Sequence, residues 1–310
     1  MKSRSSIHLL AGISLIAVLA ACGPKPAPVQ AATPEKKTII ATYSILGAAV
    51  KDLVGDAFDV KSAIPNGLDV HEWEPSGKDI EALTKASLIV ENGLGLEGGM
   101  TKALDQARKS GVKFFTASEH ITVRHVGAGE GLPSGDPDQA VGAEDPHLWT
   151  DPLAVKAVVD ALAIDLKQQF GVDLSARVAD LDARLVALNA GIQAKVDALP
   201  VTKRKLVTGH ESLGYFAQRY HFKLVGAVIP SLTTEAETSA SNLSALKKLI
   251  KQNNVSVVFT EMGTPPQTIQ ALARESKVKA VSLTTHYLPV DGSYFSFEKG
   301  LSDTILDSLK

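Results

Sequence analysis

The segment TIIATYSILGAAVKDLVGDAFDVKSAI, residues 38–64, decides the fold. Its β-branched run at 39–43 predicts a strand, 44–54 has the apolar spacing of a helix, and 59–64 predicts a second strand. Two strands separated by a helix pair in parallel through a right-handed crossover. The segment therefore predicts an α/β fold with a parallel sheet flanked by helices.

The same alternation continues along the chain. Further strands are expected at 87–92, 113–118, 205–209, 222–229, 255–260 and 279–283. Further helices are expected at 77–85, 99–110, 211–219, 240–251 and 265–275. Four strands come before residue 120 and four after residue 204. This grouping predicts two lobes, each with a four-stranded parallel sheet.

A helical region without strands separates the two groups. Asp151 and Pro152 are suited to cap and start a helix over 152–170. A longer helix at 174–199 has apolar residues at 3–4 spacing, and we expect it to be a stiff spine between the lobes. Residues 126–145 are rich in Gly, Pro and Asp, which predicts a mobile surface loop. The expected boundaries are an N-terminal lobe at 38–173, the spine at 174–199 and a C-terminal lobe at 200–310.

The N-terminus has the features of an export signal. Lys2 and Arg4 precede an apolar run at 9–21, which is too short for a transmembrane span. The run ends at Leu-Ala-Ala-Cys, and this Cys22 is the only cysteine, as in the lipobox of bacterial lipoproteins. The alternative is an ordinary secretory cleavage site at which Cys22 is incidental. The expected divisions are a lipoprotein signal peptide at 1–21 and a proline-rich, lipid-anchored tether at 22–37.

Composition excludes several classes of protein. Of 310 residues, 45% are hydrophobic and 21% charged, as in an ordinary globular chain. Lys and Arg number 32 against 34 Asp and Glu, without a basic block, so no nucleic-acid partner is expected. One cysteine rules out an intramolecular disulfide. No later apolar stretch is long enough to span a membrane. Because the chain also begins with an export signal, we expect its body in the cell envelope. It would be lipid-anchored on the outer side of the cytoplasmic membrane or in the periplasm.

Three of the eight histidines lie in turns near helix starts, where open α/β sheets bind ligands: His71, His147 and His210. Three imidazoles and one further ligand make a tetrahedral site for a divalent metal such as Zn²⁺. The alternative for each is structural, since a single loop histidine is more often structural than a ligand. His120, His125 and His221 are interpreted as solvated or structural, and His8 belongs to the signal peptide.

Four motifs resemble one family throughout the body of the chain. They are GLDVHEWEPSGKDIEALTKASLIVENGLGLE at 67–97, DPHLWTDP at 145–152, VTGHESLGYFAQRY at 207–220 and VVFTEMGTPPQTIQALARES at 257–276. Together they are similar to the zinc/manganese-type metal-binding receptors of bacterial ABC importers, the ZnuA/TroA-like family. The resemblance implies two α/β lobes joined by a spine helix, a monomer, and delivery of the metal to an ABC importer permease. It also implies that His71, His147 and His210 are ligands.

The fourth ligand stays open at this level. The family usually supplies an aspartate just after the last strand, and that position falls on Thr284, a poor ligand for zinc. His286, Glu72 and water are the other candidates, and we take His286 with the three other histidines as the predicted metal set. Manganese-type relatives often have a carboxylate where this chain has His210. Nitrogen ligands favour zinc as cargo over Mn²⁺ or Fe²⁺, which stay as alternatives.

A zinc hydrolase is the competing functional class, because three histidines with an open position also describe catalytic sites. The chain has no HExxH or GxSxG motif, and Glu72 and Glu261 are its only candidate bases. A surface adhesin on the same scaffold is a further alternative. We expect a receptor, not an enzyme. Glu261 is expected to orient a histidine or to form a salt bridge, and Trp149 to pack under His147 or in the core.

Overall fold

The computed structural model describes residues 36–131 and 140–310. The predicted signal peptide, Cys22 and nearly all of the predicted tether lie outside the described residues. Lys36–Lys310 form one compact unit. No helix in the described parts of the chain is long and apolar enough to cross a membrane.

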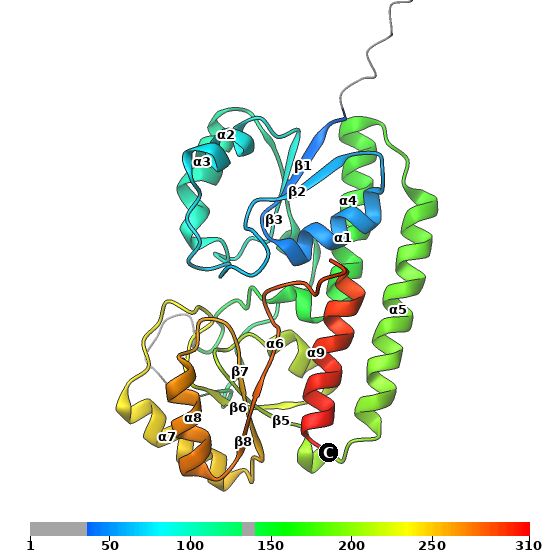
Figure 1. Ribbon diagram of the computed structural model, residues 1–310. Coiled ribbons are helices and arrows are strands. Elements are labelled where there is room, and N and C mark those ends of the chain that lie inside the picture. Colours follow the sequence, from blue (N-terminus) through cyan, green and yellow to red (C-terminus); the bar gives the residue numbers. More distant parts are fainter. Residues whose placement is uncertain (1–35, 132–139) are drawn as a thin grey trace, which may run out of the picture. The chain divides into compact units, whose positions relative to one another are not determined.

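The first four strands form one parallel sheet (Figure 1, blue to cyan). They are β1 Thr38–Ala41, β2 Asp59–Ser62, β3 Leu88–Glu91 and β4 Lys113–Thr116, in the order β2-β1-β3-β4. The accompanying helices are α1 Ser44–Val54, α2 Gly77–Thr84 and α3 Thr101–Lys109. The inner strand β3 is buried at every position, because a parallel strand is covered on both faces. Every element predicted in this region is present.

The last four strands are also parallel, but they do not form the single four-stranded sheet that the sequence predicts. The elements are β5 Lys205–Thr208, α6 Gly214–Tyr220, β6 Lys223–Ala227, α7 Ala240–Gln252, β7 Val257–Thr260, α8 Pro266–Ser276 and β8 Lys279–Ser282. Hydrogen bonds join β5 to β6 and β7 to β8, and β5 packs beside β7. The register of β5 against β6 shifts between Leu206 and Val207. Such an irregularity increases the local twist of the β5–β6 pair.

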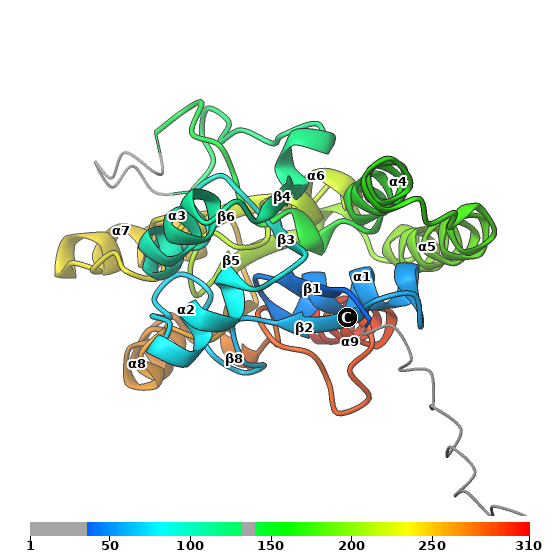
Figure 2. The same cartoon turned by 90° about the horizontal axis from the view of Figure 1, so that it is seen from above.

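Two long helices follow the first sheet and pack against each other. Asp151 caps α4, Pro152–Phe170, by accepting a hydrogen bond from the Leu153 amide, as predicted. The predicted spine is α5, Ser175–Asp197, which packs against α4, α1 and α9. Figure 2 shows α4 and α5 side by side at one edge of the unit. Short 3₁₀ helices occupy Gly98–Met100, Ala117–His120, Leu148–Thr150 and Val201–Lys203.

The C-terminal helix α9, Tyr294–Ser308, was not predicted. Its start has a cap, because the Ser293 side chain accepts a hydrogen bond from the Ser296 amide. Its buried face includes Tyr294, Phe297, Leu301 and Ile305, at the 3–4 spacing of a helix. One continuous hydrophobic cluster runs from β1 and β3 through α4 and α5 to α9. This shared core makes α9 part of the link between the two groups of strands.

The predicted mobile loop at 126–145 is described only in part, since 132–139 lie outside the described residues. Its two described flanks hydrogen bond to each other: the Val126 amide donates to the Ala143 carbonyl, and the Gly142 amide to the Val126 carbonyl, both at 2.9 Å. Arg124, just before the loop, forms an ion pair with Glu130 inside it. These contacts fix where the chain re-enters the fold, directly before His147.

Candidate metal centre

Four histidines from four separate segments meet in the interior. They are His71 in the β2–α2 loop, His147 before α4, His210 after β5 and His286 in the β8–α9 loop. One ring nitrogen from each lies within 4.8 Å of the others. All four side chains are buried, with His147 and His210 at 0% exposure. The structure thus brings together all four residues of the predicted metal set.

The spacing suits a small metal ion. The Nε2 atoms of His147 and His210 are 3.3 Å apart. A tetrahedral zinc site with Zn–N bonds of about 2.1 Å places neighbouring ligand nitrogens about 3.4 Å apart. The Nε2 atoms of His71 and His286 are buried and have no hydrogen-bond partner among the described residues. Because unpaired buried polar atoms are costly, this arrangement fits a site whose remaining partner is a metal.

Asp145 holds the ring of His147. Its Oδ1 lies 2.9 Å from Nδ1 of His147 and also accepts the backbone amide of His147 at 2.9 Å. Arg124, itself buried, donates to the other oxygen at 3.0 Å. Burial alone would raise the pKa of Asp145, but the hydrogen bond from His147 and the charge of Arg124 outweigh it and lower that pKa. The ionised carboxylate therefore keeps the proton on Nδ1 and leaves Nε2 free for a metal.

Glu261, at the end of β7, holds the segment that carries His210. Its Oε1 accepts the backbone amides of Gly209 and His210, each at 3.1 Å. The same oxygen lies 3.4 Å from Nδ1 of His210. Burial would raise the pKa of Glu261, but His210 and the hydrogen bonds lower it. Of the two roles the sequence left open for Glu261, the geometry favours orienting a histidine.

Glu261 also reaches His286, through Thr285. The Thr285 hydroxyl donates to Oε2 of Glu261 at 2.6 Å, and its oxygen lies 2.8 Å from Nδ1 of His286. A hydroxyl can donate one hydrogen bond while accepting another, so Nδ1–H of His286 points at Thr285 and Nε2 faces the other histidines. The Ser212 hydroxyl donates to the same Oε2 at 2.6 Å. One buried carboxylate thus orients two of the four histidines.

Trp149 forms a wall of the site. Its ring centroid is 5.3 Å from that of His147 and 5.6 Å from that of His286. Its indole Nε1 donates to the Thr285 carbonyl at 2.9 Å. The same ring packs on Tyr43 in the main core. Trp149 therefore packs against His147 and in the core at once, although the sequence analysis treated these two roles as alternatives.

The other candidates for the fourth ligand lie outside the cluster. Glu72 is exposed and is absent from the group of histidines. Thr284 is half-buried, and its hydroxyl lies 3.4 Å from that of Tyr287. Residues 284 and 286 share the same loop, so counting along the sequence could not establish which side chain turns inward.

The remaining described histidines have other surroundings. His120 stacks on Phe115 with centroids 4.5 Å apart, and His125 is exposed, 3.9 Å from Glu144. His221 ends α6 in the left-handed region, with φ of 57°. None of these three belongs to the cluster.

The protonation of the four site histidines follows from their environment. Burial, together with the neighbouring imidazoles, holds the pKa of His71 and of His286 well below the usual value. Burial also lowers the pKa of His147, although Asp145 opposes this. For His210, burial lowers the pKa but Glu261 outweighs it, and the net effect is a raised pKa. Neutral imidazole is the form that binds a metal, so three of the four are prepared for it at neutral pH.

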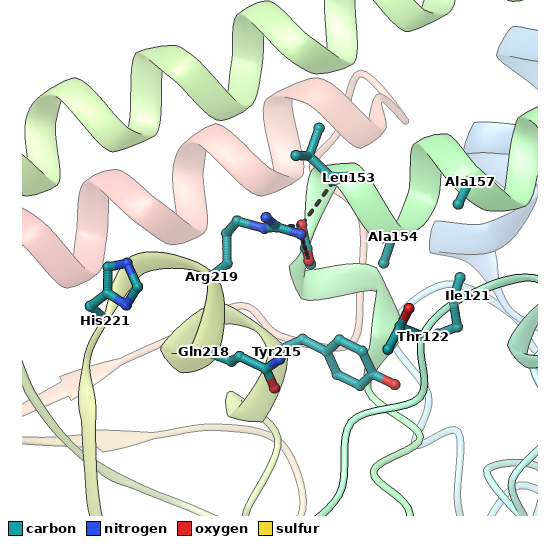
Figure 3. A pocket seen from close by; sticks show the side chains of 10 residues that line it. Ile121, Thr122, Leu153, Ala154, Ala157, Tyr215, Gln218, Arg219 and His221 are labelled. Carbon is teal, nitrogen blue, oxygen red and sulfur yellow. Dashed lines mark hydrogen bonds and ion pairs between the residues drawn. The ribbon is translucent and has the colours of Figure 1, made fainter.

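A surface pocket lies next to this region but does not contain it. Figure 3 shows this pocket between α6, which contributes Tyr215, Gln218 and Arg219, and α4, which contributes Leu153 and Ala154. The guanidinium of Arg219 binds the Asp151 carboxylate through two hydrogen bonds of 2.9 and 2.7 Å. No site histidine lines this pocket. The ion pair anchors the start of α4 directly after His147 and Trp149.

Residues 39–308 match the model of one protein family, described as "Zinc-uptake complex component A periplasmic". The chain belongs to this family, whose members are metal-binding substrate-binding proteins of ABC importers. The fold agrees, since the TroA structure from Treponema pallidum superposes with a TM-score of 0.74 at 25% identity. That superposition covers 88% of this chain and 99% of TroA.

Curated relatives carry different metals in their names. The zinc-binding protein TroA of Treponema pallidum is 28% identical over 89% of this chain and 84% of its own length. The manganese ABC transporter substrate-binding lipoprotein PsaA of Streptococcus anginosus is 27% identical over 96% of each chain. The iron ABC transporter substrate-binding lipoprotein MtsA of Streptococcus pyogenes is 28% identical over 100% of this chain and 99% of its own length. Family membership therefore establishes a metal receptor without establishing which metal it carries.

Proposed function

We propose that this protein is an extracytoplasmic lipoprotein receptor that binds Zn²⁺ and delivers it to the permease of an ABC importer. The observation that carries the proposal is the set of four buried imidazoles, with ring nitrogens within 4.8 Å of one another. No carboxylate belongs to this group of residues in the described chain. Imidazole suits zinc, whereas Mn²⁺ prefers oxygen ligands.

Four protein ligands also argue for binding rather than catalysis. A structural or storage-like zinc site is closed, with four protein ligands, whereas a catalytic site keeps one position for water or substrate. With His286 in place, a tetrahedral ion has no open position at which a water could be activated. The receptor therefore needs no covalent chemistry: the ion loses its water, exchanges it for imidazoles, and is held by them.

Burial makes capture and release depend on movement of the protein. Because all four histidines are buried, a hydrated ion cannot enter or leave while every loop is in place. The helix α5 packs along α4, α1 and α9, so large movements between the two groups of strands would disrupt a long interface. Release through the loops that carry His210 and His286 is the smaller rearrangement.

The envelope location is part of the same proposal. The names of PsaA and MtsA describe lipoproteins, and the lipobox around Cys22 predicts the same for this chain. A lipid on Cys22 would keep the receptor beside its permease, on the outer side of the cytoplasmic membrane or in the periplasm. We expect a monomer that takes no nucleic-acid partner.

A metal competition tests the proposal. The chelator-stripped chain is offered equimolar Zn²⁺, Mn²⁺ and Fe²⁺ without oxygen, and the retained metal is quantified. We expect one zinc per chain, lost in His210→Ala and weakened in His286→Ala. His125→Ala, which changes an exposed histidine outside the cluster, serves as the control and should retain zinc. Retention of manganese or iron would overturn the choice of cargo, and no stoichiometric metal would overturn the site.

A further inference from the structure

Asn66 connects two of the loops that carry site histidines. It lies in the β2–α2 loop, which also carries His71. Its Nδ2 donates to the Leu288 carbonyl at 3.0 Å, and its Oδ1 accepts the Leu288 amide at 2.7 Å. Leu288 belongs to the β8–α9 loop, two positions after His286. One side-chain amide thus binds both polar groups of a residue in the other loop, as a neighbouring strand would.

The side-chain amide of Asn66 makes a third contact. The Ser44 hydroxyl, at the start of α1, donates to Oδ1 of Asn66 at 2.9 Å. The Leu288 amide can only donate and its carbonyl can only accept, so Leu288 fixes which end is oxygen, and that oxygen accepts the Ser44 hydroxyl as well. Nδ2 then faces the Leu288 carbonyl. Ser44 is buried, which ties this arrangement to the interior.

The contacts of the His286 loop differ in their exposure. On its inner side, the hydroxyl and carbonyl of Thr285 bind Glu261 and Trp149, and these contacts are buried. On its outer side, both hydrogen bonds to Asn66 are exposed. A hydrogen bond at the surface exchanges readily with water and contributes modestly to stability, whereas a buried group left unpaired is costly. The Asn66 contact is therefore the one that can open and close at low cost.

The contact between Asn66 and Leu288 holds the loop that carries His286, a predicted ligand of the ion. The segment between β8 and α9 ends beside α1, with which α9 is in contact (Figure 1). With the contact made, His286 is held between the buried anchor at Thr285 and the surface anchor at Leu288. With it broken, the loop has lost its hydrogen bonds to the β2–α2 loop. The Leu288 side chain still packs against the main core, and Glu261 and Trp149 still hold the inner side of the loop.

We propose that Asn66 and Leu288 form a clasp that keeps the His286 loop closed over the bound ion and sets the rate at which the ion leaves. Asn66 is a positioning residue: it touches the loop, and His286 touches the metal. This inference rests on the proposed four-histidine site.

The test measures zinc release from the full chain. The protein is loaded with one Zn²⁺, mixed rapidly with excess chromophoric chelator, and the release rate is recorded. Asn66→Ala should release zinc about tenfold faster, which corresponds to about 1.4 kcal/mol. Ser44→Ala, which removes only the hydroxyl that donates to Oδ1 of Asn66, should accelerate release less. Asn253→Ala is the matched control, because this asparagine also donates to a backbone carbonyl but lies at the end of α7.

A double variant separates the clasp from general destabilisation. If Asn66 acts through His286, then Asn66→Ala should not accelerate release further in a His286→Ala background. Hydrogen exchange should also increase in the 284–290 segment of Asn66→Ala and stay unchanged around α7. Unaltered release in Asn66→Ala, or equal acceleration in Asn253→Ala, would overturn the clasp while leaving the site intact. A wild-type chain that binds no zinc would overturn the proposed function and the clasp with it.

Discussion

Replacement of Thr285 by valine tests how strongly the buried carboxylate controls the site. Valine keeps the shape of threonine but removes the hydroxyl that donates to Glu261 at 2.6 Å and lies 2.8 Å from Nδ1 of His286. Nδ1–H of His286 then has no fixed acceptor, so the ring loses both its orientation and its preferred tautomer. Removing such a partner behind a metal-binding histidine typically costs 10–100-fold in affinity, or about 1.4–2.7 kcal/mol.

The assay is competition for Zn²⁺ against a chelator of known affinity at neutral pH. Ser212→Ala is the matched control, because Ser212 donates to the same Glu261 oxygen at 2.6 Å but is not the residue that contacts His286. Both variants leave Glu261 with one hydrogen bond fewer, so their effects on folding stability should be similar. Thr285→Val should weaken zinc binding about tenfold or more and Ser212→Ala clearly less. Equal losses in the two variants, or a loss below about twofold in Thr285→Val, would refute the reasoning.

Three further predictions follow from the same contacts. Asp145→Asn should weaken zinc binding about 10–100-fold in the same competition, because an amide no longer selects the His147 tautomer with Nε2 free. Zinc affinity should fall as pH falls through the raised pKa of His210, since protons then compete for its nitrogen; titration calorimetry from pH 8 to 5 measures this. Burial holds the pKa of Glu298 in α9 well above 4.5, so the stability from its protonated form is present below pH 4.5 and is lost as pH rises towards the folded pKa. Glu298→Gln should remove this part of the pH dependence of the free energy of unfolding, which urea unfolding at a series of pH values measures.

Each of these has an outcome that contradicts it. Asp145→Asn with normal affinity and a normal circular dichroism spectrum would show that the carboxylate does not select the tautomer. Affinity independent of pH would mean that no site histidine is protonated in the metal-free chain. Parallel curves of unfolding free energy against pH for wild type and Glu298→Gln would mean that burial does not raise the pKa of Glu298 in the folded chain.

Local signals in the sequence were enough for most of the elements. Asp151 and Pro152 define the start of α4, and the predicted range 152–170 agrees with the structure. These signals act within a few residues, through capping and side-chain spacing. The helix α9 carries the same kind of signal from Ser293 onward, so its sequence also contains the information that defines it.

The pairing between strands was harder to predict from the sequence than the strands themselves. All eight strands lie where the sequence predicts them, but the separation of the last four into two hydrogen-bonded pairs, and the register shift at Leu206 and Val207 within one pair, were not predicted. Such features arise when strands pack together, and a strand's own composition does not contain them.

Some residues of the candidate site could likewise be predicted from local motifs, whereas others depend on contacts between distant segments. Three histidines were identified by their motifs, and the fourth stayed open, because whether Thr284 or His286 faces inward depends on how the loop is attached. That attachment uses the Thr285 hydroxyl and the Trp149 indole, from segments far apart in the sequence. Asp145 was within reach of sequence reasoning, since it lies two positions before His147 in DPHLW. Its partner Arg124 was not, because the intervening loop conceals their proximity.

The most direct test of the four-histidine site is X-ray absorption at the zinc edge on the metal-loaded chain. We expect four nitrogen neighbours at about 2.0–2.1 Å, with the multiple-scattering pattern of imidazole rings. In His286→Ala, the pattern should change to three imidazoles with one oxygen neighbour. A wild-type spectrum that already contains oxygen ligands, or five to six neighbours, would rule out a site made of four histidines.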